Sequence, residues 1–303
     1  MSRRLAALDV GSNTVHLLVA EPDGEGGLRE IGHDLTMPRI GKTVQATGRI
    51  GEAKLQEVVA SVRGFAERAR ELGAERLLLG ATEAMRRAED HPRALAAIGE
   101  AAGSECVLIS PDAEARLAFR GATSEGAGSG VTLVADVGGG STECVLGEGS
   151  RILALSSVPM GSSAATERWL THDPATGSDR SACGAGIREA LAAAPDGRPD
   201  RGIAVGGTAT TLPMVIDRPE GHGRLDGDDM ARIRRRLALH PSTEVAAAHA
   251  IDPVRARVLP GGLEILAAIL ERYALRSIEI SHRGIRHGML LAFLEKGEAW
   301  PEG

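Results

Sequence analysis

The stretches LAALDVGSNTVHLLVAE (residues 5–21) and TLVADVGGGSTECVLGE (residues 132–148) follow one pattern. Each has an apolar run, Asp-Val-Gly, several small polar residues, a second apolar run and a Glu. This order predicts a β-hairpin with a tight Gly-rich turn in each copy. The turns start at Asp9 and Asp136, a separation too long for a solenoid repeat and typical of a duplicated domain.

The rest of the chain alternates between strand-like and helix-like segments. Apolar residues from Leu55 to Leu72 recur at helical spacing, and Gly73 is placed to terminate that helix. We expect strands at 76–80, 106–109, 202–205 and 277–280, and helices opening near Pro92 and over 112–120, 209–216, 228–239, 261–273 and 284–295. Such alternation predicts an α/β protein with a largely buried sheet in each half. The Gly/Ser-rich stretch 121–130 predicts domains over 1–125 and 126–303, with the last helix able to pack back on the first domain.

Length and composition exclude several classes of function. The 303 residues suit two domains of about 150 residues each. Three Phe, two Trp and one Tyr are too few for the aromatic platforms that bind single-stranded nucleic acid. The net charge of −6 argues against DNA or an anionic membrane as a partner. We expect a cytosolic protein, because the N-terminus leads straight into a core-type strand and no run approaches the ~18 apolar residues of a membrane helix.

Known motifs of other enzyme classes are missing from the sequence. It contains no G-x-x-x-x-G-K-[ST], no H-E-x-x-H and no G-x-S-x-G, which excludes Walker-type ATPases, zincins and α/β-hydrolases. The three cysteines, Cys106, Cys144 and Cys183, form no C-x-x-C pair. Neither a disulfide framework nor a zinc site is therefore indicated.

The two Gly-rich turns are candidate phosphate-binding loops. Small side chains at Gly11 and at Gly138, Gly139 and Gly140 let an anion approach the backbone N–H groups closely. One such turn alone would most simply be a tight hairpin, but two matched turns that both carry Asp favour phosphate binding. A third cluster, AVGGTATTL (204–212), follows a strand and opens a helix, whose N-terminus could also bind an anion.

Carboxylates accompany both turns and offer a place for a cation. Asp136 and Glu143 lie at either end of DVGGGSTE, so the hairpin can bring both carboxylates to the same end of the turn. This suits Mg²⁺, which keeps several waters beside substrate phosphates. The alternative for Asp136, as for Asp9, is a hydrogen bond to the backbone of its own turn.

These motifs resemble the exopolyphosphatase/guanosine pentaphosphate phosphatase (Ppx/GppA) family of the actin–Hsp70–sugar kinase fold group. ALDVGSNTVHLLVAE (7–21) and ADVGGGSTECVLG (135–147) resemble its two phosphate loops. GATEAMRRA (80–88), ISPDAEARLAFRGA (109–122), VGGTATTL (205–212) and SHRGIRHGML (281–290) resemble further family segments. The resemblance covers nearly the whole chain and implies two duplicated ribonuclease-H-like (actin-like ATPase) domains with a cleft between them. Glu83 and His282 depart from the family pattern, in which a small polar residue and an acid are usual.

The resemblance also implies roles for individual residues. Glu114 would be the general base for an attacking water, and Asp136 and Glu143 would bind Mg²⁺. The substrate phosphates would be bound by Asp9, Gly11, Ser12, Asn13, Arg86, Gly138, Gly139, Gly140, Ser141, Gly207 and Thr208. The family also suggests a homodimer.

The implied activity is hydrolysis of the terminal phosphate of inorganic polyphosphate. Guanosine pentaphosphate is an alternative substrate, because it presents the same kind of phosphoanhydride. A sugar kinase of the same fold and a non-catalytic polyphosphate or nucleotide sensor are alternatives of other classes. Phosphoanhydride cleavage needs an in-line water, neutralised phosphate oxygens and an orienting carboxylate, which agrees with the residues present.

Overall fold

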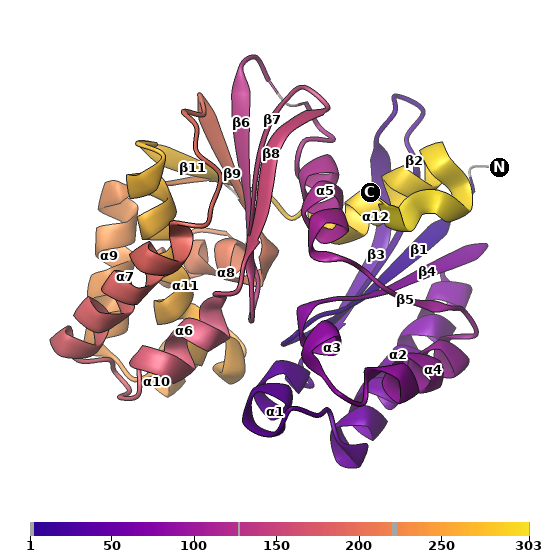
Figure 1. Cartoon of the computed structure of the whole chain (residues 1–303), viewed down its shortest axis with the longest axis horizontal. Coiled ribbons are helices and arrows are strands. Elements are labelled where there is room, and N and C mark those ends of the chain that lie inside the picture. The colour runs from indigo at the N-terminus through magenta and orange to yellow at the C-terminus, as the bar shows by residue number, and fades with distance from the viewer. Residues whose placement is uncertain (1–2, 127, 220–222, 303) are drawn as a thin grey trace. The chain divides into compact units, whose positions relative to one another are not determined.

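The chain forms two compact units in a computed structural model that describes residues 3–126, 128–219 and 223–302. Unit 1 comprises Met1–Glu125 and Arg283–Gly303, and unit 2 comprises Gly126–His282. Figure 1 labels the helices and strands of both units. The segment from Arg283 therefore belongs to unit 1. The sequence-based division assigns this segment to the domain over 126–303, with the last helix able to pack back on the first domain.

Unit 1 contains a five-stranded sheet that is antiparallel on one side of β1 and parallel on the other. Its strands, in spatial order, are β3 (Leu28–Thr36), β2 (Val15–Pro22), β1 (Leu5–Val10), β4 (Arg76–Ala81) and β5 (Cys106–Leu108). β1 pairs antiparallel with β2 and parallel with β4. The first predicted hairpin is thus present as β1 and β2.

Helices cover both faces of this sheet. They are α1 (Ile40–Thr47), α2 (Glu52–Glu71), α3 (Glu83–Arg87), α4 (His91–Ala102), α5 (Pro111–Ala122) and α12 (Ile285–Lys296), followed by a 3₁₀ turn over Gly297–Glu302. Side chains of β1 alternate between two cores, as the period of a strand requires. Leu8 packs with residues of α2 and α4, whereas Leu5 packs with residues of α5 and α12. The central strand is consequently buried from both sides.

Unit 2 repeats the strand order of unit 1 and adds one edge strand. Its order is β10 (Arg224–Asp226), β11 (Ser277–Ile280), β9 (Arg201–Val205), β6 (Val131–Val137), β7 (Thr142–Glu148) and β8 (Arg151–Val158). β6 pairs antiparallel with β7 and parallel with β9. The two hairpins therefore occupy the same position in two sheets of the same topology, which supports duplication.

The helices of unit 2 surround its larger core. They are α6 (Ser162–Trp169), α7 (Gly177–Leu191), α8 (Gly206–Thr211) with a 3₁₀ turn over Leu212–Ile216, α9 (Gly227–Leu239), α10 (Ser242–His249) and α11 (Pro253–Arg272). The predicted helix over 209–216 is wrong in its bounds, because the α-helix starts at Gly206 and becomes 3₁₀ at Leu212. The predicted helix over 261–273 begins earlier, at Pro253 after the capping residue Asp252, and continues through Pro260.

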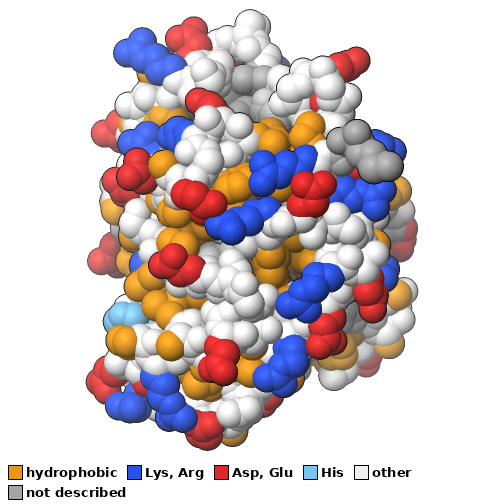
Figure 2. Space-filling view, turned by 90° about the vertical axis from the view of Figure 1, so that its right-hand side faces the viewer, with side chains coloured by type: hydrophobic (Ala, Val, Ile, Leu, Met, Phe, Trp, Pro, Cys, Tyr) orange, Lys and Arg blue, Asp and Glu red, His pale blue; other side chains and the backbone are white. Residues whose placement is uncertain are grey.

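The surface carries both signs of charge. On the face drawn in Figure 2, acidic and basic side chains are interspersed, with apolar side chains between them. Among the described residues, no helix combines the length and apolar character needed to cross a bilayer. The mixture of charges agrees with the modest net charge of −6.

Candidate active site

The first Gly-rich loop is held by its carbonyl groups. The N–H of Gly11 donates to the Thr14 carbonyl at 2.9 Å and closes the turn. The Ser12 carbonyl accepts from the N–H of Gly41 at 2.8 Å, and the Asn13 carbonyl accepts from the N–H of Arg39 at 3.0 Å. Within the described ranges, the N–H of Ser12 has no acceptor. A loop whose carbonyls are taken by a helix start can offer its own N–H groups to an anion.

The second loop is built in the same way. The N–H of Gly138 donates to the Ser141 carbonyl at 3.0 Å. The carbonyls of Gly138 and Gly139 accept from the first N–H groups of α6, at 2.9 Å from Ser162 and 3.0 Å from Ser163. The N–H groups of Gly139 and Gly140 have no acceptor in the part of the chain that the structure describes. Both predicted loops therefore have the backbone arrangement of an anion-binding nest.

Two carboxylates share one face of the sheet in unit 2. Asp136 on β6 is directly opposite Glu143 on β7, so both side chains project to the same side. Glu143 is only 2% exposed, and its Oε1 accepts a hydrogen bond of 2.7 Å from the Ser157 hydroxyl. The Asp136 carboxylate reaches the start of α8, where a Cβ placed on Gly206 would lie 2.6 Å from Oδ1. The hairpin thus brings the two predicted metal ligands together.

The predicted base and the predicted substrate arginine form a buried ion pair in unit 1. Nη1 of Arg86 in α3 lies 2.7 Å from Oε2 of Glu114 in the first turn of α5. The side chains are 17% and 11% exposed, respectively. The same Nη1 also donates to the Ile109 carbonyl at 2.8 Å. The amphipathic pattern of α5 alone is equally compatible with a surface glutamate, but Glu114 is buried and its carboxylate is fixed by a charge-assisted hydrogen bond.

Comparison with known proteins decides the family. The model of the Ppx/GppA phosphatase family matches residues 18–297. The chain belongs to this family. It is 30% identical to "Exopolyphosphatase 2" of Mycobacterium tuberculosis, over 95% of this chain and 98% of that protein. It is 27% identical to the "Guanosine-5'-triphosphate,3'-diphosphate pyrophosphatase" of Aliivibrio fischeri, but covers only 60% of that protein.

A solved structure shows the same fold. The Aquifex aeolicus PPX-GPPA enzyme shares 27% identity with this chain, with a TM-score of 0.82 over 96% of this chain and 100% of that one. The predicted fold class, two ribonuclease-H-like (actin-like) α/β domains, is therefore confirmed. As a Ppx/GppA protein with relatives of these names, the chain is an enzyme that hydrolyses phosphoanhydride bonds.

The remaining predicted residues of this Ppx/GppA protein also lie beside the loops. Asp9 on β1 is directly opposite His16 on β2, the position that corresponds to Asp136 and Glu143 in unit 2. Gly207 and Thr208 are in the first turn of α8. Glu114 and Arg86 belong to unit 1, whereas Asp136 and Glu143 belong to unit 2.

Sequence reasoning missed residues that contact the site across long sequence separations. Arg255 in α11 lies over Gly207, because a Cβ on that glycine would be only 1.9 Å from Nη1 of Arg255. Ser157 in β8 donates to Glu143. Glu83 was noted only as a departure from the family pattern, yet it accepts a hydrogen bond from Ser12. None of these contacts has a periodic or motif signal in the sequence.

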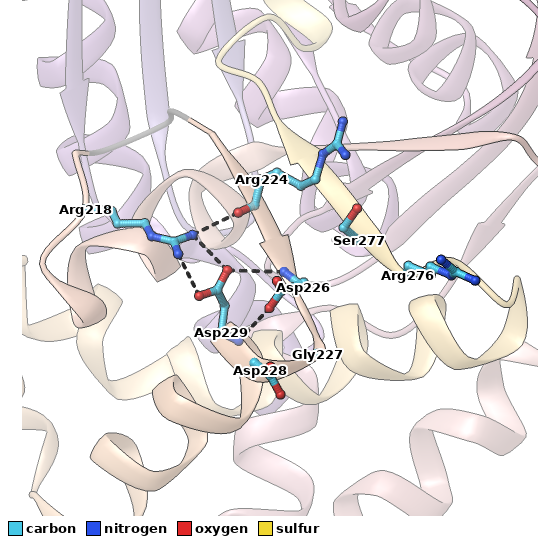
Figure 3. A pocket seen from close by; sticks show the side chains of 8 residues that line it. All are labelled: Arg218, Arg224, Asp226, Gly227, Asp228, Asp229, Arg276 and Ser277. Atoms are coloured by element: carbon cyan, nitrogen blue, oxygen red, sulfur yellow. Dashed lines mark hydrogen bonds and ion pairs between the residues drawn. The ribbon is translucent and has the colours of Figure 1, made fainter.

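A pocket of about 530 Å³ in unit 2 is separate from these residues. It lies between α9, β10 and β11 and is lined by Arg218, Arg224, Asp226, Gly227, Asp228, Asp229, Arg276 and Ser277 (Figure 3). Arg218 makes two hydrogen bonds of 2.8 Å to the Asp229 carboxylate, and Asp226 caps α9. Three arginines and three aspartates therefore line the pocket, but of the arginines drawn in Figure 3 only Arg218 is directed at an aspartate, and no residue predicted for the active site lines the pocket.

Proposed function

We propose that this protein is an exopolyphosphatase, which hydrolyses the terminal phosphate of inorganic polyphosphate with Mg²⁺. The observation that carries the proposal is the buried Arg86–Glu114 pair at 2.7 Å. It joins two residues, 28 positions apart, that the family resemblance assigns to substrate binding and to water activation. The full-length match to a relative named exopolyphosphatase supports polyphosphate as the substrate.

Glu114 acts on the nucleophile in this proposal. Its carboxylate, held by Arg86, orients a water in line with the terminal phosphorus and accepts the proton that the water loses. The bond between the water oxygen and phosphorus forms while the bond from phosphorus to the bridging oxygen breaks. The products are inorganic phosphate and a chain shorter by one phosphate. Arg86 and the loop N–H groups offset the negative charge on the phosphate oxygens.

Asp136 and Glu143 are the residues that would hold Mg²⁺. They are hard oxygen ligands on one sheet face, and Mg²⁺ is commonly held by one or two carboxylates with waters and substrate phosphate completing its shell. Among the described residues, no group of three or more His, Cys, Asp or Glu could hold a metal ion, so substrate and water would have to complete the shell. When bound, the ion would neutralise charge on the phosphate oxygens.

Guanosine pentaphosphate hydrolysis is the second candidate function. Relatives named guanosine-5'-triphosphate,3'-diphosphate pyrophosphatase match this chain, but the chain spans about three fifths of the first of them. The predicted homodimer and cytosolic location stay predictions. Size-exclusion chromatography with light scattering tests the dimer.

The decisive experiment measures phosphate release with Mg²⁺ from long polyphosphate, tripolyphosphate, guanosine pentaphosphate and ATP. Glu114→Gln keeps the size of the side chain and removes the base, so release from polyphosphate should fall by about 100-fold with the fold intact. Asp112→Asn is the matched control, since Asp112 is exposed in the same helical turn, and it should leave the rate within about twofold.

The substrate ranking then identifies the activity. Faster release from guanosine pentaphosphate than from polyphosphate would favour the second candidate. Near-normal turnover by Glu114→Gln would remove Glu114 from its role. Tight polyphosphate binding by a folded wild-type protein without release would favour a sensor, and ATP use that depends on a sugar would favour a kinase.

A further inference from the structure

A buried carboxylate lies beside the first phosphate loop and has no role in the reaction above. Glu83 begins α3 directly after β4 and is 9% exposed. Its Oε2 accepts a hydrogen bond of 2.8 Å from the Ser12 hydroxyl, and its Oε1 lies 3.0 Å from Nη1 of Arg87. Ser12 is itself only 8% exposed. The Ser12–Glu83 bond is therefore a buried, charge-assisted hydrogen bond between the loop and a helix.

This hydrogen bond uses the only proton that the Ser12 hydroxyl can donate. A serine hydroxyl has a single proton, and here that proton points to the carboxylate. The side chain of Ser12 consequently cannot donate to a phosphate oxygen while the bond is intact. The first loop must meet an anion with its backbone N–H groups, such as that of Ser12, which has no acceptor among the described residues.

The same bond completes the attachment of the loop. The Ser12 carbonyl is fixed from one side by the N–H of Gly41 at the start of α1. The Ser12 side chain is fixed by Glu83 at the start of α3. Unit 2 has no equivalent of this side-chain bond in its loop, because the position that corresponds to Ser12 is Gly139.

We propose that Glu83 is a positioning residue of the first phosphate loop: it accepts the hydrogen bond of the Ser12 hydroxyl and fixes the loop so that its backbone N–H groups bind a substrate phosphate. The inference rests on the proposed phosphohydrolase function and assigns Glu83 to phosphate affinity, separate from the chemical step. Because the loop binds phosphate in the ground state and in the transition state alike, loss of the bond should raise KM more than it changes kcat.

A double-mutant cycle tests this assignment. Ser12→Ala and Glu83→Ala each remove the same bond, so each should raise KM for polyphosphate about tenfold and change kcat less than threefold. The double variant should be no worse than either single variant. Glu83→Gln keeps a carbonyl oxygen as acceptor and should restore KM to within about threefold of the wild type.

A second measurement separates binding from activity. Calorimetric binding of tripolyphosphate in the Glu114→Gln background should weaken about tenfold with Glu83→Ala and recover with Glu83→Gln. Val62→Ala is the stability control, because Val62 is fully buried in α2, away from the loop, and its truncation should lower the Tm without moving KM.

The outcomes are distinguishable. KM and tripolyphosphate affinity at wild-type values in Ser12→Ala and Glu83→Ala, with only a changed Tm, would overturn the positioning role while leaving the proposed function intact. Additive effects of the two single variants would overturn it as well. A wild-type protein that neither binds nor hydrolyses polyphosphate would overturn the proposed function, and the inference with it.

Discussion

The two hairpins have nearly the same backbone and different side chains. In both, a turn hydrogen bond of about the same length, 2.9 Å at Gly11 and 3.0 Å at Gly138, closes the loop, and a helix start binds its carbonyls. The row of side chains across the sheet differs, from the edge strand inward: Leu35, His16 and Asp9 in unit 1, and Ser157, Glu143 and Asp136 in unit 2. The duplicated backbone is therefore common to both units, and the side chains distinguish them.

The difference in side chains suggests that the two hairpins share one task of phosphoanhydride hydrolysis, which is binding phosphate, and differ in the other, which is supplying carboxylates. Backbone N–H groups can bind phosphate oxygens in either loop, whatever the side chains are. Only the row of unit 2 has two adjacent carboxylates, with a hydroxyl hydrogen-bonded to one of them. In unit 1 the carboxylate that we propose as the general base comes instead from outside the hairpin, since Glu114 is in α5. We therefore expect substitutions at equivalent positions to have unequal effects.

We expect the largest difference between equivalent substitutions at the positions opposite Asp9 and Asp136, which are His16 and Glu143. Glu143→Gln removes one of the two charges proposed for Mg²⁺, so phosphate release should fall about 100-fold and calorimetry should show weaker Mg²⁺ binding. His16→Gln at the equivalent position should change the rate less than about tenfold and leave Mg²⁺ binding unchanged. Equal losses in the two variants would contradict the division of tasks between the hairpins.

The next largest difference is expected between Gly161 and Gly41, the glycines that allow a helix start to approach each loop. A Cβ on Gly161 would lie 2.4 Å from the carbonyl carbon of Gly139, whereas a Cβ on Gly41 would lie 3.0 Å from the Cβ of Ser12. Gly161→Ala must therefore displace backbone, and we expect a loss of about 1–3 kcal/mol in unfolding free energy and at least about tenfold in rate.

Gly41→Ala is the matched comparison. Its close contact is milder, and alanine favours a helix by roughly 0.5–1 kcal/mol over glycine. Its Tm should stay within a few degrees of the wild-type value. Thermal unfolding and phosphate release on both variants measure the difference, and a larger loss in Gly41→Ala than in Gly161→Ala would contradict the expected order.

The sequence predicts the duplicated hairpins well, because their information is local. Apolar runs around Asp-Val-Gly define strands and a turn, and the hairpin then places Asp136 opposite Glu143 without further information. Helix bounds are less predictable where a breaker residue is overridden by packing. Pro260 and the following glycines favour a late start for α11, but Asp252 caps the helix at Pro253 and the segment is buried against α6 and α8.

The contacts that fix the site are not local and leave no pattern. Ser12 and Glu83 are 71 positions apart, and Ser157 reaches Glu143 only because β8 pairs with β7 in a particular register. A hydroxyl or a carboxylate at such positions is equally compatible with a solvated surface residue. The role proposed for Glu114 follows only from resemblance to a family, since its helix has an ordinary amphipathic pattern.

A smaller effect is expected at the edge strands. Ser157→Ala removes the donor to Glu143, and loss of a partner that orients a metal ligand costs about 10-fold in metal affinity or activity. Leu35 is at the corresponding position of β3 and is 41% exposed, so Leu35→Ala should leave the rate within about twofold. Rates at a series of Mg²⁺ concentrations distinguish the cases, since excess Mg²⁺ should partly restore Ser157→Ala. No rescue at any concentration would argue against a role through the metal.

The smallest effect is expected from thiol reagents, which report how firmly the second hairpin is held. Cys144 follows Glu143 in β7, and its burial, with the nearby Glu143 charge, raises the pKa of its thiol to about 12. The thiolate fraction at pH 8.5 is then below about 0.1%, because the pH lies far under the pKa. Iodoacetamide at this pH should leave the native wild-type activity unchanged over an hour. Gly161→Ala loosens the loop that precedes this strand and should accelerate labelling of Cys144, as measured by mass spectrometry, whereas Gly41→Ala in unit 1 should not. Rapid labelling of Cys144 in the wild type would show that the second hairpin opens readily, and would remove rigidity of the backbone as the common property of the two units.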